Sequence, residues 1–184
     1  MGTFSKTYIQ EKDPQKVLLQ LRLFFNTGQE VELEQEYDWW FYPERKNDTI
    51  IVSQNNFSWT EVTFNFITGL YGYDEILRQI SSNLQCLILL GYYQSTSGEA
   101  RFAKFERGKL DLSIAQRVGG DSMLLIDNFG VTNEFQQKFL IPKIHQPFND
   151  LDWDGLYKLY KHFGLSIFNE VEDDKYLHIE NMIS

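Results

Sequence analysis

The sequence predicts an α+β fold in which helices pack on an antiparallel sheet, and we expect one domain that spans residues 1–184. The first observation is a meander at residues 86–118, where three strand-like segments follow one another through short loops. The second is that helical patterns are grouped apart from these strands instead of alternating with them, which is typical of α+β proteins. The third is composition: 184 residues, 42% hydrophobic and 16% aromatic, suit one packed core.

The N-terminal part predicts a short strand at residues 4–10, followed by a helix. Asp13 is a suitable capping residue, and Pro14 suits the first helical position. Gly28 is a suitable C-terminal stop. A core-facing stripe at helical spacing consists of Val17, Leu18, Leu21 and Phe25.

The next segments predict strands and then a second helix. Residues 29–37 alternate between acidic and apolar positions, which is the pattern of a strand with one solvated face. Residues 49–53 and 59–67 are rich in β-branched and aromatic residues, so we expect two further strands. A helix is predicted from about Asp74 to Ser82, with its apolar face made of Tyr73, Ile76, Leu77 and Ile80.

The meander is the best-defined part of the prediction. Residues 86–93 are apolar on both faces, as in a central strand. Residues 99–106 form the next strand, and Arg107-Gly108 form a tight turn before residues 109–118. In that last strand we expect burial of Leu110, Leu112, Ile114 and Val118. The opposite, solvated set is Asp111, Ser113 and Arg117.

The C-terminal part predicts fewer elements. Residues 121–149 show no clear pattern apart from a helix at about 133–139. A final helix begins at Asp150 or Asp152, ends at Gly164 and has an apolar stripe of Trp153, Leu156, Tyr157, Tyr160 and Phe163. Residues 165–168 and 176–179 are expected to form short edge strands.

Charge narrows the classes of partner. The net charge is −9, with −3 in residues 1–56, zero in 57–120 and −6 in 121–184. Nucleic-acid binding requires clustered Lys and Arg, which the sequence lacks. An acidic surface instead attracts a basic protein partner. The longest apolar run is too short for a membrane span, and no signal-peptide pattern opens the sequence, so we expect a cytoplasmic protein without a membrane partner.

An acidic and aromatic segment is the predicted partner-binding site. Glutamates alternate along one strand face and run into a cluster of aromatic residues, which is the composition of many protein-binding surfaces. Stacked aromatics could also bind sugars, and the same pattern fits an ordinary solvated strand beside core aromatics. The candidate residues are Glu30, Glu32, Glu34, Glu36, Asp38, Trp39, Trp40 and Tyr42.

Patterns of catalysis and metal binding are missing from the sequence. It contains no nucleophile elbow, phosphate loop or dinucleotide motif, so we expect no enzyme and no cofactor. Residues 150–155 match the first half of a calcium loop, but Lys161 stands where the bidentate carboxylate is needed. The three histidines, His145, His162 and His178, have no metal-ligand spacing. Cys86 is expected to be a buried, unreactive thiol.

One stretch resembles a known family. Residues 76–114 run from a helix to an apolar strand, Gln94-Ser95, a turn, an aromatic strand, Glu106-Arg107-Gly108-Lys109-Leu110 and a further strand. This order is similar to the middle of small bacterial immunity proteins, which neutralise toxins delivered between competing cells. The resemblance implies an acidic cytoplasmic protein that occludes a toxin. An enzyme with a site assembled from scattered acids and histidines, or a regulatory or structural subunit, are the alternatives.

Overall fold

The computed structural model describes residues 3–25, 27–33, 48–55, 58–64, 70–94, 97–119, 122–140, 151–165 and 176–181. Its strands are β1 (Thr3–Ile9), β2 (Thr27–Leu33), β3 (Asp48–Asn55), β4 (Trp59–Phe64), β5 (Leu87–Gln94), β6 (Glu99–Glu106), β7 (Lys109–Gly119), β8 (Ser122–Phe129) and β9 (Tyr176–Asn181). Its helices are α1 (Pro14–Leu21), α2 (Asp74–Leu84), α3 (Glu134–Gln137), the 3₁₀ turn η1 (Lys138–Leu140) and α4 (Trp153–His162).

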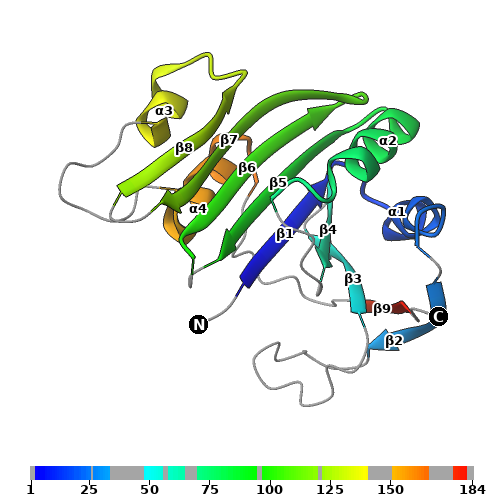
Figure 1. The fold of residues 1–184 in the computed structure, drawn as a ribbon. Helices are drawn as coiled ribbons and strands as arrows, with labels where there is room; N and C mark the ends of the chain where they lie inside the picture. Colours follow the sequence, from blue (N-terminus) through cyan, green and yellow to red (C-terminus); the bar gives the residue numbers. More distant parts are fainter. Residues whose placement is uncertain are drawn as a thin grey trace.

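The described strands form one antiparallel sheet in the order β2-β9-β3-β4-β1-β5-β6-β7-β8. The predicted α+β fold and the meander, here β5-β6-β7, are therefore confirmed. Figure 1 shows β8 at one end of the sheet and β2 near the other. β1 lies between β4 and β5 and so joins the meander to the rest of the sheet.

Helices cover both faces of the sheet. On one face, α1 and α2 pack over a core that includes Val17, Leu77 and Ile88. On the other face, α4 packs over a core that includes Phe102 and Tyr160. Figure 1 shows α4 behind the sheet and α1 and α2 together at its other side. β5 contributes to both cores, which explains why its sequence is apolar on both faces.

The helix termini follow the predicted capping chemistry. The Asp13 side chain accepts a hydrogen bond from the Gln15 backbone N–H, and Pro14 is the first residue of α1. The predicted stop at Gly28 is wrong, because α1 ends at Leu21 and Gly28 lies within β2. The N–H groups of residues 24 and 25 both donate to the Leu21 carbonyl, so a tight turn provides hydrogen bonds for this last carbonyl of the helix.

A β-bulge divides the apolar residues of β7 between the two cores. Lys104 pairs with Leu112 and Phe105 with Leu110, so Asp111 is the extra residue. Leu112 consequently packs in the α4 core, whereas the partly buried Leu110 packs against the α1/α2 core. Ile114 is buried, and Asp111 and Arg117 are exposed, as predicted.

The helix predicted at about 133–139 is confirmed as the short α3 followed by the 3₁₀ turn η1. Three other expectations need correction. Ser113, predicted to face water, is fully buried. Trp153, predicted as part of the apolar stripe, is 37% exposed. β9, predicted as an edge strand, lies inside the sheet because both β2 and β3 pair with it. Residues 166–168 lie outside the described part of the chain.

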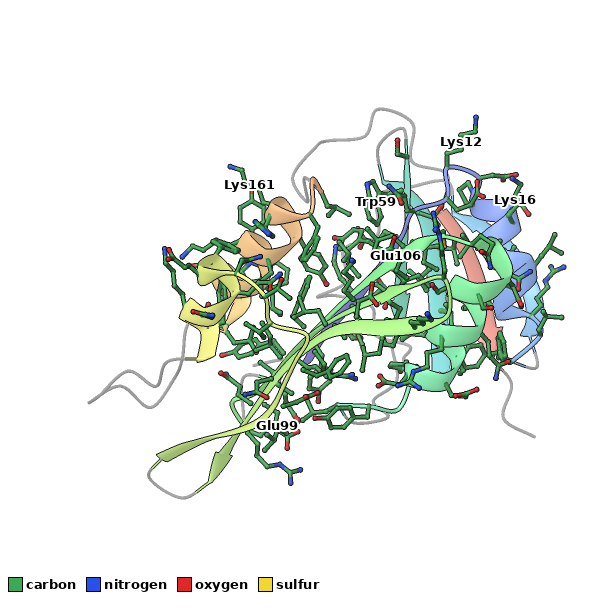
Figure 2. The ribbon with its side chains drawn as sticks, turned by 90° about the horizontal axis from the view of Figure 1, so that it is seen from above. Lys12, Lys16, Trp59, Glu99, Glu106 and Lys161 are labelled. Atoms are coloured by element: carbon green, nitrogen blue, oxygen red, sulfur yellow. The ribbon has the colours of Figure 1, made fainter. Side chains whose placement is uncertain are left out.

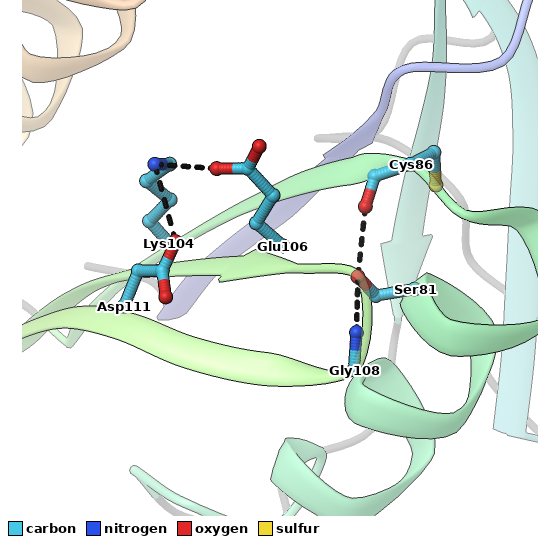
Figure 3. Close-up of polar contacts among 6 residues, drawn as sticks. All are labelled: Ser81, Cys86, Lys104, Glu106, Gly108 and Asp111. Atoms are coloured by element: carbon cyan, nitrogen blue, oxygen red, sulfur yellow. Dashed lines mark hydrogen bonds and ion pairs between the residues drawn. The ribbon is translucent and has the colours of Figure 1, made fainter.

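The turn between β6 and β7 is tied to α2 and β5 by one serine. The Ser81 hydroxyl donates a hydrogen bond to the Cys86 carbonyl (2.8 Å) and accepts one from the Gly108 N–H (3.2 Å), as Figure 3 shows. Beyond the same turn, Lys104 Nζ lies 2.9 Å from Glu106 and 3.4 Å from Asp111. The two hydrogen bonds of Ser81 hold the meander hairpin against the end of α2.

Candidate functional site

The predicted partner-binding residues lie only partly within the described chain. Glu30 and Glu32 belong to β2, where strand alternation puts them on one face. β2 has one neighbour in the described sheet, β9, and so stands at its end. The side chains of both glutamates lie outside the described residues, as do all of Glu34, Glu36, Asp38, Trp39, Trp40 and Tyr42.

A second aromatic and acidic surface lies at the opposite end of the sheet. Tyr71, just before α2, is 44% exposed, and Phe129, at the end of β8, is 54% exposed. Asp74 and Asp127 are partly exposed beside them. We call these four residues, Tyr71, Asp74, Asp127 and Phe129, the anchor surface.

The anchor surface is organised by a buried arginine on β6. The Arg101 side chain is fully buried, and its guanidinium forms a two-pronged ion pair with Asp74, with N–O distances of 2.5 and 2.8 Å. It also donates to the Leu70 carbonyl (2.7 Å) and to the Ser113 hydroxyl (3.0 Å). A buried charge requires such compensation. The contacts therefore fix the start of α2, and the loop residue before it, against β6 and β7.

Arg101 also positions the exposed tyrosine. The guanidinium carbon lies 4.2 Å from the centre of the Tyr71 ring, a cation–π contact. Partial burial, and then the negative charge of Asp127, raise the pKa of the Tyr71 hydroxyl. Tyr71 therefore stays protonated at neutral pH and keeps a hydrogen-bond donor for a partner.

The register of the last two strands places Phe129 and Asp127 on the same face as Arg101. Phe129 pairs with Ser113, which accepts the Arg101 hydrogen bond, and Asp127 pairs with Ala115. Directly paired residues of an antiparallel ladder project from the same face. The outer edge of β8 has no strand partner among the described residues. The anchor surface thus combines two half-exposed aromatic groups, carboxylates and a strand edge without a partner among the described strands.

Sequence reasoning missed this surface because it missed β8. Residues 123–126 are a continuous apolar run that follows the Gly119-Gly120 pair, which is a recognisable signal for a hairpin. Tyr71 lay in no predicted element, and no sequence pattern connects it with Arg101. Only the pairing of β6, β7 and β8 brings these residues together.

A second cluster of polar side chains lies on the face of the sheet that α4 covers. Lys6 Nζ and Glu61 Oε1 form a 2.5 Å ion pair, and the Tyr8 side chain nearby is fully buried. Among the described residues, no atom lies in position to form a hydrogen bond with the Tyr8 hydroxyl. Burial, and then the charge of Glu61, raise its pKa far above the ordinary value. This hydroxyl is therefore protonated at neutral pH.

Three other residues singled out in the sequence, Cys86, Asp152 and His162, have contacts or burial that account for them structurally. Burial raises the pKa of the Cys86 thiol to about 12, so its nucleophilic form is suppressed. The Asp152 carboxylate caps α4 by accepting the Gly155 N–H at 2.9 Å. His162 stacks on Phe135 with ring centres 4.6 Å apart. His145 and the His178 side chain lie outside the described residues. Within the described ranges, no group of three or more His, Cys, Asp or Glu residues is placed to hold a metal ion.

Among the helices described, none has the length and apolar character needed to span a bilayer. Comparison of the chain with known proteins gives no match to a protein-family model, to a curated protein or to a solved structure.

Proposed function

We propose that this chain is a protein-binding module that takes a basic protein partner through the anchor surface. The observation that carries the proposal is the pairing of two half-exposed aromatic side chains, Tyr71 and Phe129, with the carboxylates of Asp74 and Asp127. Aromatic anchors supply most of the energy of many protein interfaces. Arg101 neutralises Asp74, so the net negative charge that favours a positively charged partner is that of Asp127.

The preorganisation of the surface supports a binding role. Tyr71 rests on a guanidinium that is itself held by Asp74, Ser113 and the Leu70 carbonyl. An aromatic side chain whose position is fixed before binding loses little conformational entropy when the complex forms. The −9 net charge adds a long-range field that speeds the approach of a basic partner.

The resemblance of residues 76–114 to bacterial immunity proteins supplies the class of partner. We propose that the partner is an antibacterial toxin, and that the chain neutralises it in the cytoplasm by occluding its active site. In this proposal the chain acts by binding, and no residue has a catalytic role. The segment that carries the resemblance includes Arg101, which organises the anchor surface.

The acidic strand β2 is the competing location for the interface. At about 4.8 Å per strand, β2 lies six spacings from β6 and eight from β8, so the two surfaces are about 29–38 Å apart along the sheet. The Debye length at physiological salt is about 8 Å. A partner docked at the anchor surface would therefore not be held by the glutamates of β2, and variants of the two surfaces have separable effects.

The first experiment tests the class of partner. The protein encoded immediately upstream of this chain is expressed in bacteria with and without the chain. We expect growth arrest without the chain and growth with it, together with a purified complex of the two proteins. Arrest that is unaffected by the chain, or an upstream protein that neither arrests growth nor binds, would contradict the immunity proposal.

The second experiment locates the interface on the purified pair. Replacing Tyr71 and Phe129 with Ser is expected to raise the dissociation constant about 30-fold, which corresponds to about 2 kcal/mol for aromatic anchors. The matched control replaces Leu19 of α1 and Leu23 in the turn that follows it, which are 56% and 67% exposed, and should leave affinity unchanged.

Glutamine variants test the competing surface. Replacing Glu30, Glu32, Glu34 and Glu36 with Gln should leave the association rate unchanged across salt concentrations if the partner docks at the anchor surface. A slower, less salt-dependent association in this variant, with normal binding of the Tyr71/Phe129 variant, would place the interface at β2 instead.

A further inference from the structure

A small hollow lies where α3 meets the outer side of α4. It has a volume of about 240 Å³ and is lined by Phe135, Lys158, Lys161 and His162. The three α4 residues stand at positions i, i+3 and i+4, so the helix presents them on one face. Figure 2 shows Lys161 on α4, with α3 alongside.

Among the described residues, no carboxylate forms an ion pair with the lysines of the hollow, Lys158 and Lys161, although Asp154 lies one turn before Lys158. Like charges three or four residues apart on a helix destabilise it slightly. A bound anion would relieve this repulsion and would be attracted by both ammonium groups.

The imidazole at the hollow is held in a fixed orientation. Phe135 stacks on the His162 ring at an angle of 18°, and Phe163 meets the ring edge-on at 83°. Phe163 is itself stacked on Phe102 of the core, with ring centres 5.7 Å apart. His162 carries an N–H donor in either protonation state. The hollow therefore has a rigid aromatic wall beside its cationic groups.

The helix dipole explains part of this arrangement. Cations near a helix C-terminus are favourable, and Lys161 and His162 occupy the last turn of α4. The dipole accounts neither for Lys158, one turn earlier, nor for the aromatic wall. If the lysines only complemented the helix dipole, their removal would slightly lower the stability of the protein, and the hollow would bind no anion.

We propose that this hollow binds a small phosphate monoester that carries an aromatic or other flat apolar group. A phosphate dianion neutralises both ammonium groups, whereas a carboxylate supplies one charge only. Lysine is a common point-charge partner of phosphate. The hollow is shallow and smaller than the roughly 300–1,000 Å³ of pockets for drug-sized ligands, so it contacts only the phosphate and the group next to it. The Phe135 ring contacts the flat group of the ester.

The test is a titration of the full chain with phenyl phosphate, inorganic phosphate and benzoate, followed by NMR signals of the His162 ring. We expect saturable shifts with phenyl phosphate, weaker binding of inorganic phosphate because it lacks the ring, and weaker binding of benzoate because it lacks the second charge. Benzoate binding as tightly as phenyl phosphate, or shifts that do not saturate with any of the three, would overturn the proposal.

Lysine variants show whether the binding belongs to this hollow. Replacing Lys158 and Lys161 with Ala should weaken phenyl phosphate binding about tenfold or more, the loss expected when charged hydrogen-bond donors are removed. Both side chains are exposed, so the variant is expected to fold, and circular dichroism checks this. Lys138→Ala, an exposed lysine of η1 outside the hollow lining, is the matched control. Equal weakening in the control, or unchanged affinity in the double variant, would refute the site.

Discussion

Replacing Asp74 with Asn tests whether the buried guanidinium depends on its carboxylate. The change keeps the size of the side chain but leaves Arg101, which is fully buried, with an uncompensated charge. Breaking a buried ion pair by removing one partner costs about 3–5 kcal/mol. The Asp74 side chain is 20% exposed, so water compensates part of this loss and we expect about 3 kcal/mol. For a chain of this length, that loss lowers Tm by about 6–12 °C.

The assay is urea unfolding followed by tryptophan fluorescence and circular dichroism, with Glu75→Gln as the control. Glu75 is exposed in the same first turn of α2 and hydrogen-bonds only the exposed Gln79 among the described contacts, so its change should cost less than about 0.5 kcal/mol. A loss below about 1 kcal/mol for Asp74→Asn would refute the reasoning.

A double-mutant cycle isolates the pair itself. Arg101→Met removes the charge and leaves the Asp74 carboxylate without its partner. The double variant Arg101→Met/Asp74→Asn should therefore cost less than the sum of the two single losses, by about 2 kcal/mol. Strict additivity would mean that the two residues stabilise the protein independently, in spite of their contact.

Three further predictions concern the packing of the sheet. Ser81→Ala should cost about 1–3 kcal/mol in urea unfolding, because the Gly108 N–H loses its partner and the Cys86 carbonyl keeps only the longer bond from the Arg107 N–H. Gly91→Ala should cost about 1–3 kcal/mol by calorimetry, since an added methyl group would collide with the Tyr160 ring; an unchanged Tm would contradict this packing. The Cys86 thiol should react with a disulfide reagent at pH 8 only as fast as the chain unfolds. The free energy of unfolding should also fall as pH rises above about 8.5. Above that pH the thiol of the unfolded chain ionises, whereas the folded thiol, with its pKa of about 12, does not. Rapid labelling of the folded chain would show that the thiol is accessible.

The sequence was sufficient for elements whose local pattern agrees with their tertiary environment. β6 and the Arg107-Gly108 turn match the prediction residue for residue, and α2 starts at Asp74, as predicted. Residues 86–93 were recognised as a central strand because both faces are apolar. In each case the hydrophobic period, turn chemistry and burial favour the same structure.

The rest depended on contacts that no local pattern encodes. A bulge at Asp111 sends two leucines of one strand to opposite cores, which a simple alternation cannot predict. Ser113 is buried on the face where it accepts a hydrogen bond from Arg101 of the neighbouring strand β6. The predicted acidic site at Glu30 and Glu32 remains a prediction, while the anchor surface emerged only from the register of β7 and β8.

The position of β9 has a consequence for the order of folding. Residues 176–181 lie between β2 and β3, so the hydrogen bonds of those two early strands to β9 form only after about 120 further residues beyond Asn55 have been synthesised. At bacterial and eukaryotic rates of about 5–20 residues per second, this delay is about 6–24 s. During that interval β2 and one side of β3 lack this pairing, and unpaired strand edges promote aggregation. The nascent chain is therefore most exposed to misassembly at the end of the sheet that carries Glu30 and Glu32, where like charges on neighbouring copies repel one another.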